Sequence, residues 1–115
     1  MYVQLVWFDG PRSEQAVEAS RRAGRERLKP LVEAHPDLRT GLLGGVRAVG
    51  SDGAECVVVL ARDAAALDTL EHLVMSSELL PGEDPALLTG PDRVGRYVAS
   101  DVFGRLADLT TGAQR

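Results

Sequence analysis

The sequence has few of the residues that cross-link small proteins or bind metals. One cysteine, Cys56, cannot form a disulfide within the chain, and two histidines add little to a metal site. No apolar run is long enough to cross a bilayer, and the N-terminal residues lack the basic region and cleavage site of a signal peptide. We therefore expect a cytoplasmic protein with no metal or other cofactor and no membrane partner.

Neither sign of charge dominates the chain. It has 13 Lys and Arg against 17 Asp and Glu, a formal net charge of −4. The densest basic cluster alternates with acidic residues at helical spacing, such as Glu18 with Arg22 and Lys29 with Glu33. Proteins that bind duplexes concentrate positive charge on one face. The sequence therefore argues against nucleic acid as a partner and predicts a solvated, charged helix face.

Length and composition fit one compact domain. With 115 residues, 44% of them hydrophobic, the chain can bury a core without disulfides. Hydrophobic periodicity and turn residues predict, in chain order, a strand at 2–8, a helix from Ser13 to about Ala34, a strand at 40–49, a turn at 51–53, a strand at 55–60, a helix at 64–75, a loop at 81–92 and a strand at 93–100. We expect the domain to cover residues 1–100 and a C-terminal tail to cover residues 101–115.

The first helix contains three residues that helices usually avoid. Gly24 falls within its apolar stripe, so we expect a close packing contact at that position. Pro30 is expected either to bend the helix or to start its last turn, because proline lacks the N–H that the helix interior needs. Pro36 is expected to end the helix, since the residue before a proline avoids helical angles.

Other local signals fix where the remaining elements begin and turn. Ser13 and Asp63 precede the two helices and are expected N-caps. The glycines of the second strand, at positions 41, 44 and 45, predict a β-bulge. The Asp52-Gly53 pair predicts a tight hairpin turn between the second and third strands, because it readily supplies positive φ angles.

The order strand, helix, strand, strand, helix, strand is that of the ferredoxin-like α+β fold. Its antiparallel sheet carries both helices on one face. A sheet whose second face met water would alternate apolar and polar residues, yet the strands at 2–8 and 55–60 are apolar on both sides. A second copy of the same sheet would cover that face. We therefore expect a homodimer that closes a barrel.

The element order and the end of the first helix resemble the dimeric α+β barrel superfamily, and within it the antibiotic biosynthesis monooxygenase-like (ABM-like) proteins. Residues 27–38, RLKPLVEAHPDL, are similar to that family's pattern of a proline within the helix and a proline-led turn into the second strand. The resemblance spans roughly residues 2–100. It implies a dimeric α+β barrel and, as activity, a cofactor-independent monooxygenase or isomerase acting on a small apolar metabolite.

Two other classes of function stay open. The family's oxygenases and haem degraders typically use an asparagine with a tryptophan that follows the third strand. This chain has no asparagine, and its one tryptophan, Trp7, is on the first strand. That difference favours a non-catalytic module that binds a small molecule or a partner through the 81–92 loop. Haem binding, the third class, depends on His72, whose spacing from the apolar stripe of its helix predicts a solvent-facing side chain.

Four residues are candidates for contact with a small-molecule ligand, and no catalytic residue is identified. Trp7 is either a core residue or an aromatic wall of a pocket inside the barrel. Arg47 and Arg96 stand among apolar neighbours on expected edge strands. Each therefore needs a carboxylate from the other subunit or an anionic ligand, unless its head reaches water. Tyr97, on the opposite face from Arg96, is expected to hydrogen-bond to a ligand or to backbone.

Overall fold

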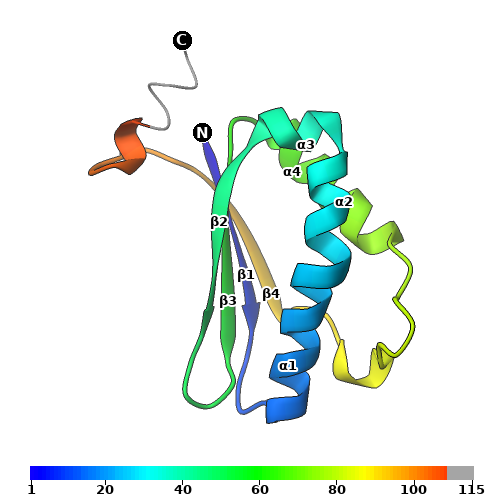
Figure 1. The fold of residues 1–115 in the computed structure, drawn as a ribbon. Helices are drawn as coiled ribbons and strands as arrows, with labels where there is room; N and C mark the ends of the chain where they lie inside the picture. The colour runs from blue at the N-terminus through cyan, green and yellow to red at the C-terminus, as the bar shows by residue number, and fades with distance from the viewer. Residues whose placement is uncertain (109–115) are drawn as a thin grey trace.

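The computed structural model describes residues 1–108, so residues 109–115 of the expected tail lie outside the described residues. Its elements are β1 (Tyr2–Phe8), α1 (Glu14–Arg22), η1 (Ala23–Leu28), α2 (Lys29–Ala34), α3 (Pro36–Gly41), β2 (Leu42–Val49), β3 (Glu55–Ala61), α4 (Ala64–Ser76), η2 (Pro85–Leu87) and β4 (Arg93–Val98). The strands form one antiparallel sheet in the order β2-β3-β1-β4. The labelled helices all lie on one side of it (Figure 1). The predicted ferredoxin-like α+β fold is confirmed.

Strand register assigns each side chain of the sheet to one of two faces. Gln4 pairs with Arg96, and the Arg96 guanidinium reaches Asp68 on α4, so this row of side chains faces the helices. The alternate residues of each strand form the opposite face, which we call the outer face. Its members are Val3, Leu5, Trp7, Gly44, Val46, Ala48, Cys56, Val58, Leu60, Arg93, Gly95 and Tyr97.

The first helix runs without a break from Glu14 to Ala34, but its hydrogen-bond pattern changes in the middle. The Lys29 N–H donates to the Gly24 carbonyl, which is the five-residue step of a π-helix. Pro30 explains this change, because it has no N–H for the carbonyl four residues back and its ring crowds that carbonyl. Pro30 lies in the first turn of α2, which confirms the expectation that it starts the last segment of the helix.

The expected close packing at Gly24 is wrong. A Cβ added at Gly24 would have no non-neighbouring heavy atom within 4 Å, whereas Ala23 beside it is buried, with 5% of its surface exposed. The π segment places one extra residue in a turn of the helix. A buried face predicted from regular α-helical spacing is therefore displaced in the π segment, and Gly24 falls outside it.

Pro36 begins a short helix, α3, instead of leading directly into the second strand. The extended backbone of His35 separates α2 from α3, as expected before a proline. Proline also suits the first position of a helix, because its φ is already helical. Leu38 of α3 is 1% exposed, so burial of this side chain stabilises the extra turn. The second strand therefore begins at Leu42, two residues later than predicted, and the last strand ends at Val98, two residues earlier than predicted.

The predicted hairpin and bulge are both present. The Gly50 N–H donates to the Ala54 carbonyl at 2.8 Å, and Gly53 has a φ of +86°. A Cβ at Gly53 would also lie 2.5 Å from the Arg12 carbonyl oxygen, so the turn requires glycine there for two reasons. In β2 the pairing with β3 shifts between Leu42 and Gly44, which is the expected β-bulge.

The core is small and lies where α4 meets the sheet. Ala61, Ala66 and Leu67 form a buried cluster, with Tyr2, Leu42 and Val59 packed against it. Both predicted N-caps hold the helices in place. The Ala16 N–H donates to the Ser13 hydroxyl at 3.1 Å, and the Ala66 N–H donates to the Asp63 carboxylate at 2.8 Å.

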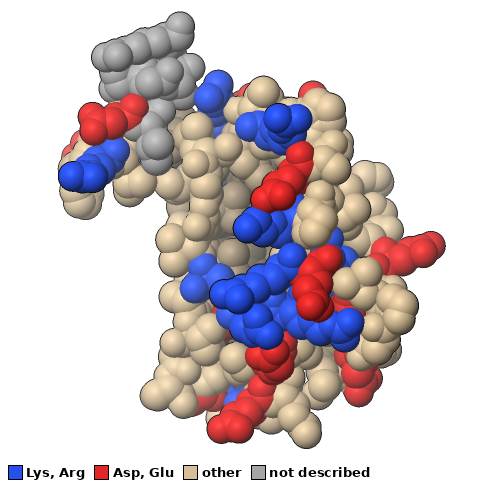
Figure 2. All heavy atoms as spheres, viewed as in Figure 1, with Lys and Arg blue, Asp and Glu red and all other residues tan. Residues whose placement is uncertain are grey.

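Charged side chains of both signs cover the helices. Figure 2 shows Lys and Arg side chains beside Asp and Glu side chains there. Lys29 lies 3.9 Å from Glu33, as predicted. The predicted pair of Glu18 with Arg22 is wrong, because Glu18 pairs with Arg21 and Arg22 pairs with Glu26 at 2.6 Å. Within residues 1–108, no helix combines the length and the apolar content that a bilayer crossing requires.

Candidate functional site

The outer face is an apolar surface that the described helices leave uncovered (Figure 1). Leu5 and Val58 stand side by side at its centre, on the two central strands, yet neither is buried. At its edges Val46 is 63% exposed and Tyr97 is 52% exposed. Apolar side chains on central strands are normally buried once a sheet is packed on both sides. This face is therefore the first candidate for an interaction surface.

Two of the predicted ligand contacts, Trp7 and Tyr97, lie on this outer face. The Arg93 guanidinium lies 4.7 Å from the centre of the Trp7 ring, an attractive cation–π contact. The Tyr97 ring folds along β4 over Gly95, where an added Cβ would lie 2.7 Å from the tyrosine hydroxyl. Glycine at position 95 therefore allows the ring to lie flat on the sheet. Both aromatic rings extend the apolar surface.

The other two predicted contacts, Arg47 and Arg96, face the helices from the two edge strands. Arg96 lies 2.7 Å from the Asp68 carboxylate and 3.7 Å from that of Glu71, both on α4, and it also donates to the Gln4 side chain. The predicted positions of Arg47 and Arg96 on edge strands are confirmed, because β2 and β4 are the outer strands of the sheet. Each arginine has the carboxylate partner that it was expected to need, but Asp68 and Glu55 of the same chain supply it in place of a second subunit or a ligand.

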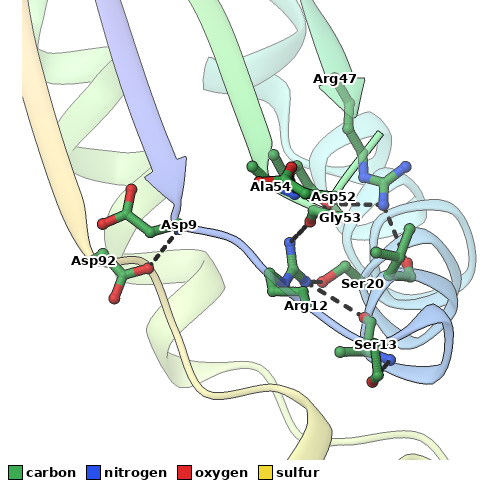
Figure 3. A network of polar contacts seen from close by, with 12 residues as sticks. Asp9, Arg12, Ser13, Ser20, Arg47, Asp52, Gly53, Ala54 and Asp92 are labelled. Atoms are coloured by element: carbon green, nitrogen blue, oxygen red, sulfur yellow. Dashed lines mark hydrogen bonds and ion pairs between the residues drawn. The ribbon is translucent and has the colours of Figure 1, made fainter. Parts of the chain in front are cut away.

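Arg47 belongs to a network of polar contacts that also contains Arg12 and Ser20 (Figure 3). The Glu55 side chain is 3% exposed and lies 2.8 Å from Arg47 and 3.4 Å from Arg12. Arg12 also donates to the Ser20 hydroxyl at 2.7 Å and stacks on Phe8, and Arg47 donates to the Val17 carbonyl at 3.1 Å. The Arg12–Glu55–Arg47 cluster therefore ties α1 to β2 and β3.

A second buried ion pair holds the 81–92 loop against the helices. Arg27 lies 3.0 Å from Glu83, and the two side chains are 10% and 2% exposed. Arg27 also donates to the Ser77 hydroxyl at 2.6 Å, and the Leu80 N–H donates to Glu83 at 3.0 Å. Burial alone would raise the pKa of Glu83, but the hydrogen bonds from Leu80 and Arg27 and the charges of Arg27 and Arg22 outweigh burial and lower that pKa.

The attachment of this loop is expected to depend on pH. Because the folded-state pKa of Glu83 lies below its ordinary value of 4.5, the contribution of Glu83 to stability is present above pH 4.5 and is lost as pH falls through the folded pKa. In an NMR titration, the Leu80 amide shift should follow the Glu83 carboxylate with a midpoint below 4.5. The Glu83→Gln variant should lose this step, and a midpoint at or above 4.5 in the unaltered protein would contradict the assignment.

Two grooves lie between α1 and the 81–92 loop, one on each side of Leu87. The larger has a volume of about 570 Å³ and its lining includes Ala19, Arg22 and Leu88, while the smaller has about 330 Å³ and its lining includes Phe8 and Arg12. Both volumes lie in the range of small-molecule sites, about 300–1,000 Å³. Trp7, Arg47, Arg96 and Tyr97 are not among the described residues that line either groove. The sequence thus gave no signal for these grooves beyond the length of the loop.

The described residues offer little for metal chemistry. Within residues 1–108, no group of three or more His, Cys, Asp or Glu side chains is placed to hold a metal ion. His72 on α4 is exposed, which agrees with the side-chain direction expected from its spacing. Cys56 is a free thiol on the outer face.

The fold has a counterpart among solved structures. It is similar to that of a dimeric ferredoxin-like protein from an uncultured marine organism, with a TM-score of 0.58 and 13% sequence identity, over 90% of this chain and 91% of that one. No protein-family model matches the chain, and no curated protein matches it significantly. The chain is therefore similar in fold to the marine protein, and this likeness supports the ferredoxin-like class.

Proposed function

We propose that this chain is one subunit of a homodimeric α+β barrel, in which two copies pack their outer faces together. The uncovered apolar outer face carries the proposal, because a lone subunit leaves Leu5 and Val58 only half-buried on its central strands. The similar marine protein is described as dimeric, which adds support. Hiding each half-exposed Val or Leu contributes about 1 kcal/mol, and two-fold symmetry doubles every such contribution.

A more specific assignment, to the ABM-like proteins, is also part of the proposal. The βαββαβ order and Pro30 in the first turn of α2 support it. The family's enzymes would make the chain a cofactor-independent monooxygenase or isomerase of a small apolar metabolite. Such an enzyme would convert a polyketide-like phenol, whereas a binding module would only be stabilised by it.

The contacts around the candidate residues favour the binding module. Arg96, on one edge strand, is neutralised by Asp68 and Glu71, which leaves it poorly placed to polarise a substrate. Arg47, on the other edge strand, faces the helices and lies 2.8 Å from the Glu55 carboxylate, so it too is already paired within its own chain. Trp7 and Tyr97 are proposed as apolar walls of the space between the two sheets.

The dimer is tested with two valines that stand on opposite faces of edge strands. Val46 lies on the outer face and is 63% exposed; Val94 lies on the helix side and is 57% exposed. Val46→Asp brings two carboxylates into one symmetric interface, and the cost of burying charge should weaken dimerisation by about 100-fold or more. Val94→Asp, the matched control, should dimerise as the unaltered protein does.

Sedimentation equilibrium at micromolar concentration provides the measurement. The unaltered chain and Val94→Asp should each give about twice the subunit mass of 12.3 kDa, while Val46→Asp should move to 12.3 kDa itself. A mass of 12.3 kDa for the unaltered chain would overturn the proposal.

A further inference from the structure

The segment that follows β4 leaves the body of the subunit. We call residues 99–108 the C-terminal arm. The Ala99 N–H donates to the Met1 carbonyl at 2.9 Å, which ties the start of the arm to the sheet. The arm then extends on the side of the sheet opposite to the helices (Figure 1). Gly104, with a φ of +67°, turns the chain, and residues 106–108 are helical.

The arm presents large apolar side chains to solvent. Phe103 is 83% exposed and Leu106 is 49% exposed, although both residue types are usually buried in folded proteins. Within this short turn, the Ala107 N–H donates to Gly104 and the Asp108 N–H to Arg105. Exposed apolar side chains that lie close together often mark a surface that binds another molecule. Phe103 and Leu106 therefore make the arm a candidate to pack against another surface.

We infer that the arm of each subunit packs against the second copy, with Phe103 as the aromatic anchor. This inference rests on the proposed dimer. The arm extends on the side of the outer face, so a copy seated on that face would lie within its reach. Two-fold symmetry places two such arms on the dimer, one from each subunit. Aromatic anchors of this kind commonly contribute most to an interface.

Dimer affinity tests the role of the apolar pair. The double variant Phe103→Ala with Leu106→Ala should raise the dissociation constant of the dimer by about 10- to 100-fold. Both side chains are largely exposed in the subunit, so its fold should be unaffected. The control is Met75→Ala with Leu79→Ala, two apolar residues that are 80% and 43% exposed on the far side of the molecule. This control should leave the dissociation constant unchanged.

A cross-link tests where the arm lies. In a Cys56→Ala background, Arg105→Cys carrying a benzophenone maleimide should yield a covalently linked pair of chains on irradiation. If the unaltered chain is dimeric but the arm variant keeps its affinity, or the cross-link forms only within one chain, the arm inference fails and the barrel proposal stands. If the unaltered chain is a monomer, the barrel proposal fails first, and the arm inference fails with it.

Discussion

Glu55→Ala is expected to lower the free energy of unfolding by about 3–5 kcal/mol, the usual cost of removing one partner from a buried ion pair. Glu55 is 3% exposed on its side chain and is the carboxylate nearest to both Arg12 and Arg47. Its removal leaves two half-buried guanidinium groups without their neutralising charge. Urea denaturation at fixed protein concentration, followed by circular dichroism, measures the difference.

The matched control for this prediction is an exposed ion pair. Glu26 pairs with Arg22 at 2.6 Å, but its side chain is 56% exposed. Glu26→Ala should therefore cost less than about 1 kcal/mol, as is usual for surface pairs. Equal losses from Glu55→Ala and Glu26→Ala would show that the Arg12–Glu55–Arg47 cluster contributes no more than a surface contact.

Leu67→Ala is expected to lower the free energy of unfolding by about 2–5 kcal/mol, because it leaves a cavity in the core. Leu67 is completely buried and packs with Ala61 and Ala66. With so few fully buried residues in the subunit, neighbouring side chains can replace little of the lost packing. Met75→Ala on the same helix, where the side chain is 80% exposed, is the control.

The Met75→Ala control should change stability by less than about 0.5 kcal/mol. Because a dimer gains stability with concentration, both variants must be compared at one protein concentration. A loss below about 1 kcal/mol for Leu67→Ala would mean that the contact between α4 and the sheet contributes less than its burial indicates.

Much of the fold could be predicted because its signals are local. Ser13 and Asp63 cap the helices through their own side chains, and Gly53 supplies the φ that the hairpin needs. The strands at 2–8 and 55–61 show their apolar character on both faces in the sequence alone. Each of these features depends on residues within a few positions of one another.

The errors arose where one local rule competed with another. Pro36 ends one helix and also suits the first position of the next, and burial of Leu38 decides in favour of the new helix. The π segment before Pro30 shifts the phase of the helix. The predicted apolar stripe therefore placed Gly24 on the buried face, whereas the structure buries the preceding residue, Ala23. A periodicity calculated at a constant α-helical spacing cannot detect such a shift.

The sequence could predict that the arginines of the candidate site need carboxylate partners, but not which residues supply them. The need of Arg47 and Arg96 for a carboxylate follows from their apolar neighbours in sequence. That Glu55 and Asp68 would supply it depends on strand register and helix placement. The Arg27–Glu83 pair joins residues 56 positions apart, and nothing in either local sequence indicates it.

The bulge in β2 and the arginines of β4 have a consequence for solubility. A regular, uncharged edge strand can recruit the edge of another molecule, which leads to fibrils. One edge of this sheet is interrupted where its register slips at Gly44, and the other carries Arg93 and Arg96. Addition of further strands is therefore hindered at both edges of the sheet, which disfavours open-ended polymers. The apolar outer face remains available to pack against a second copy.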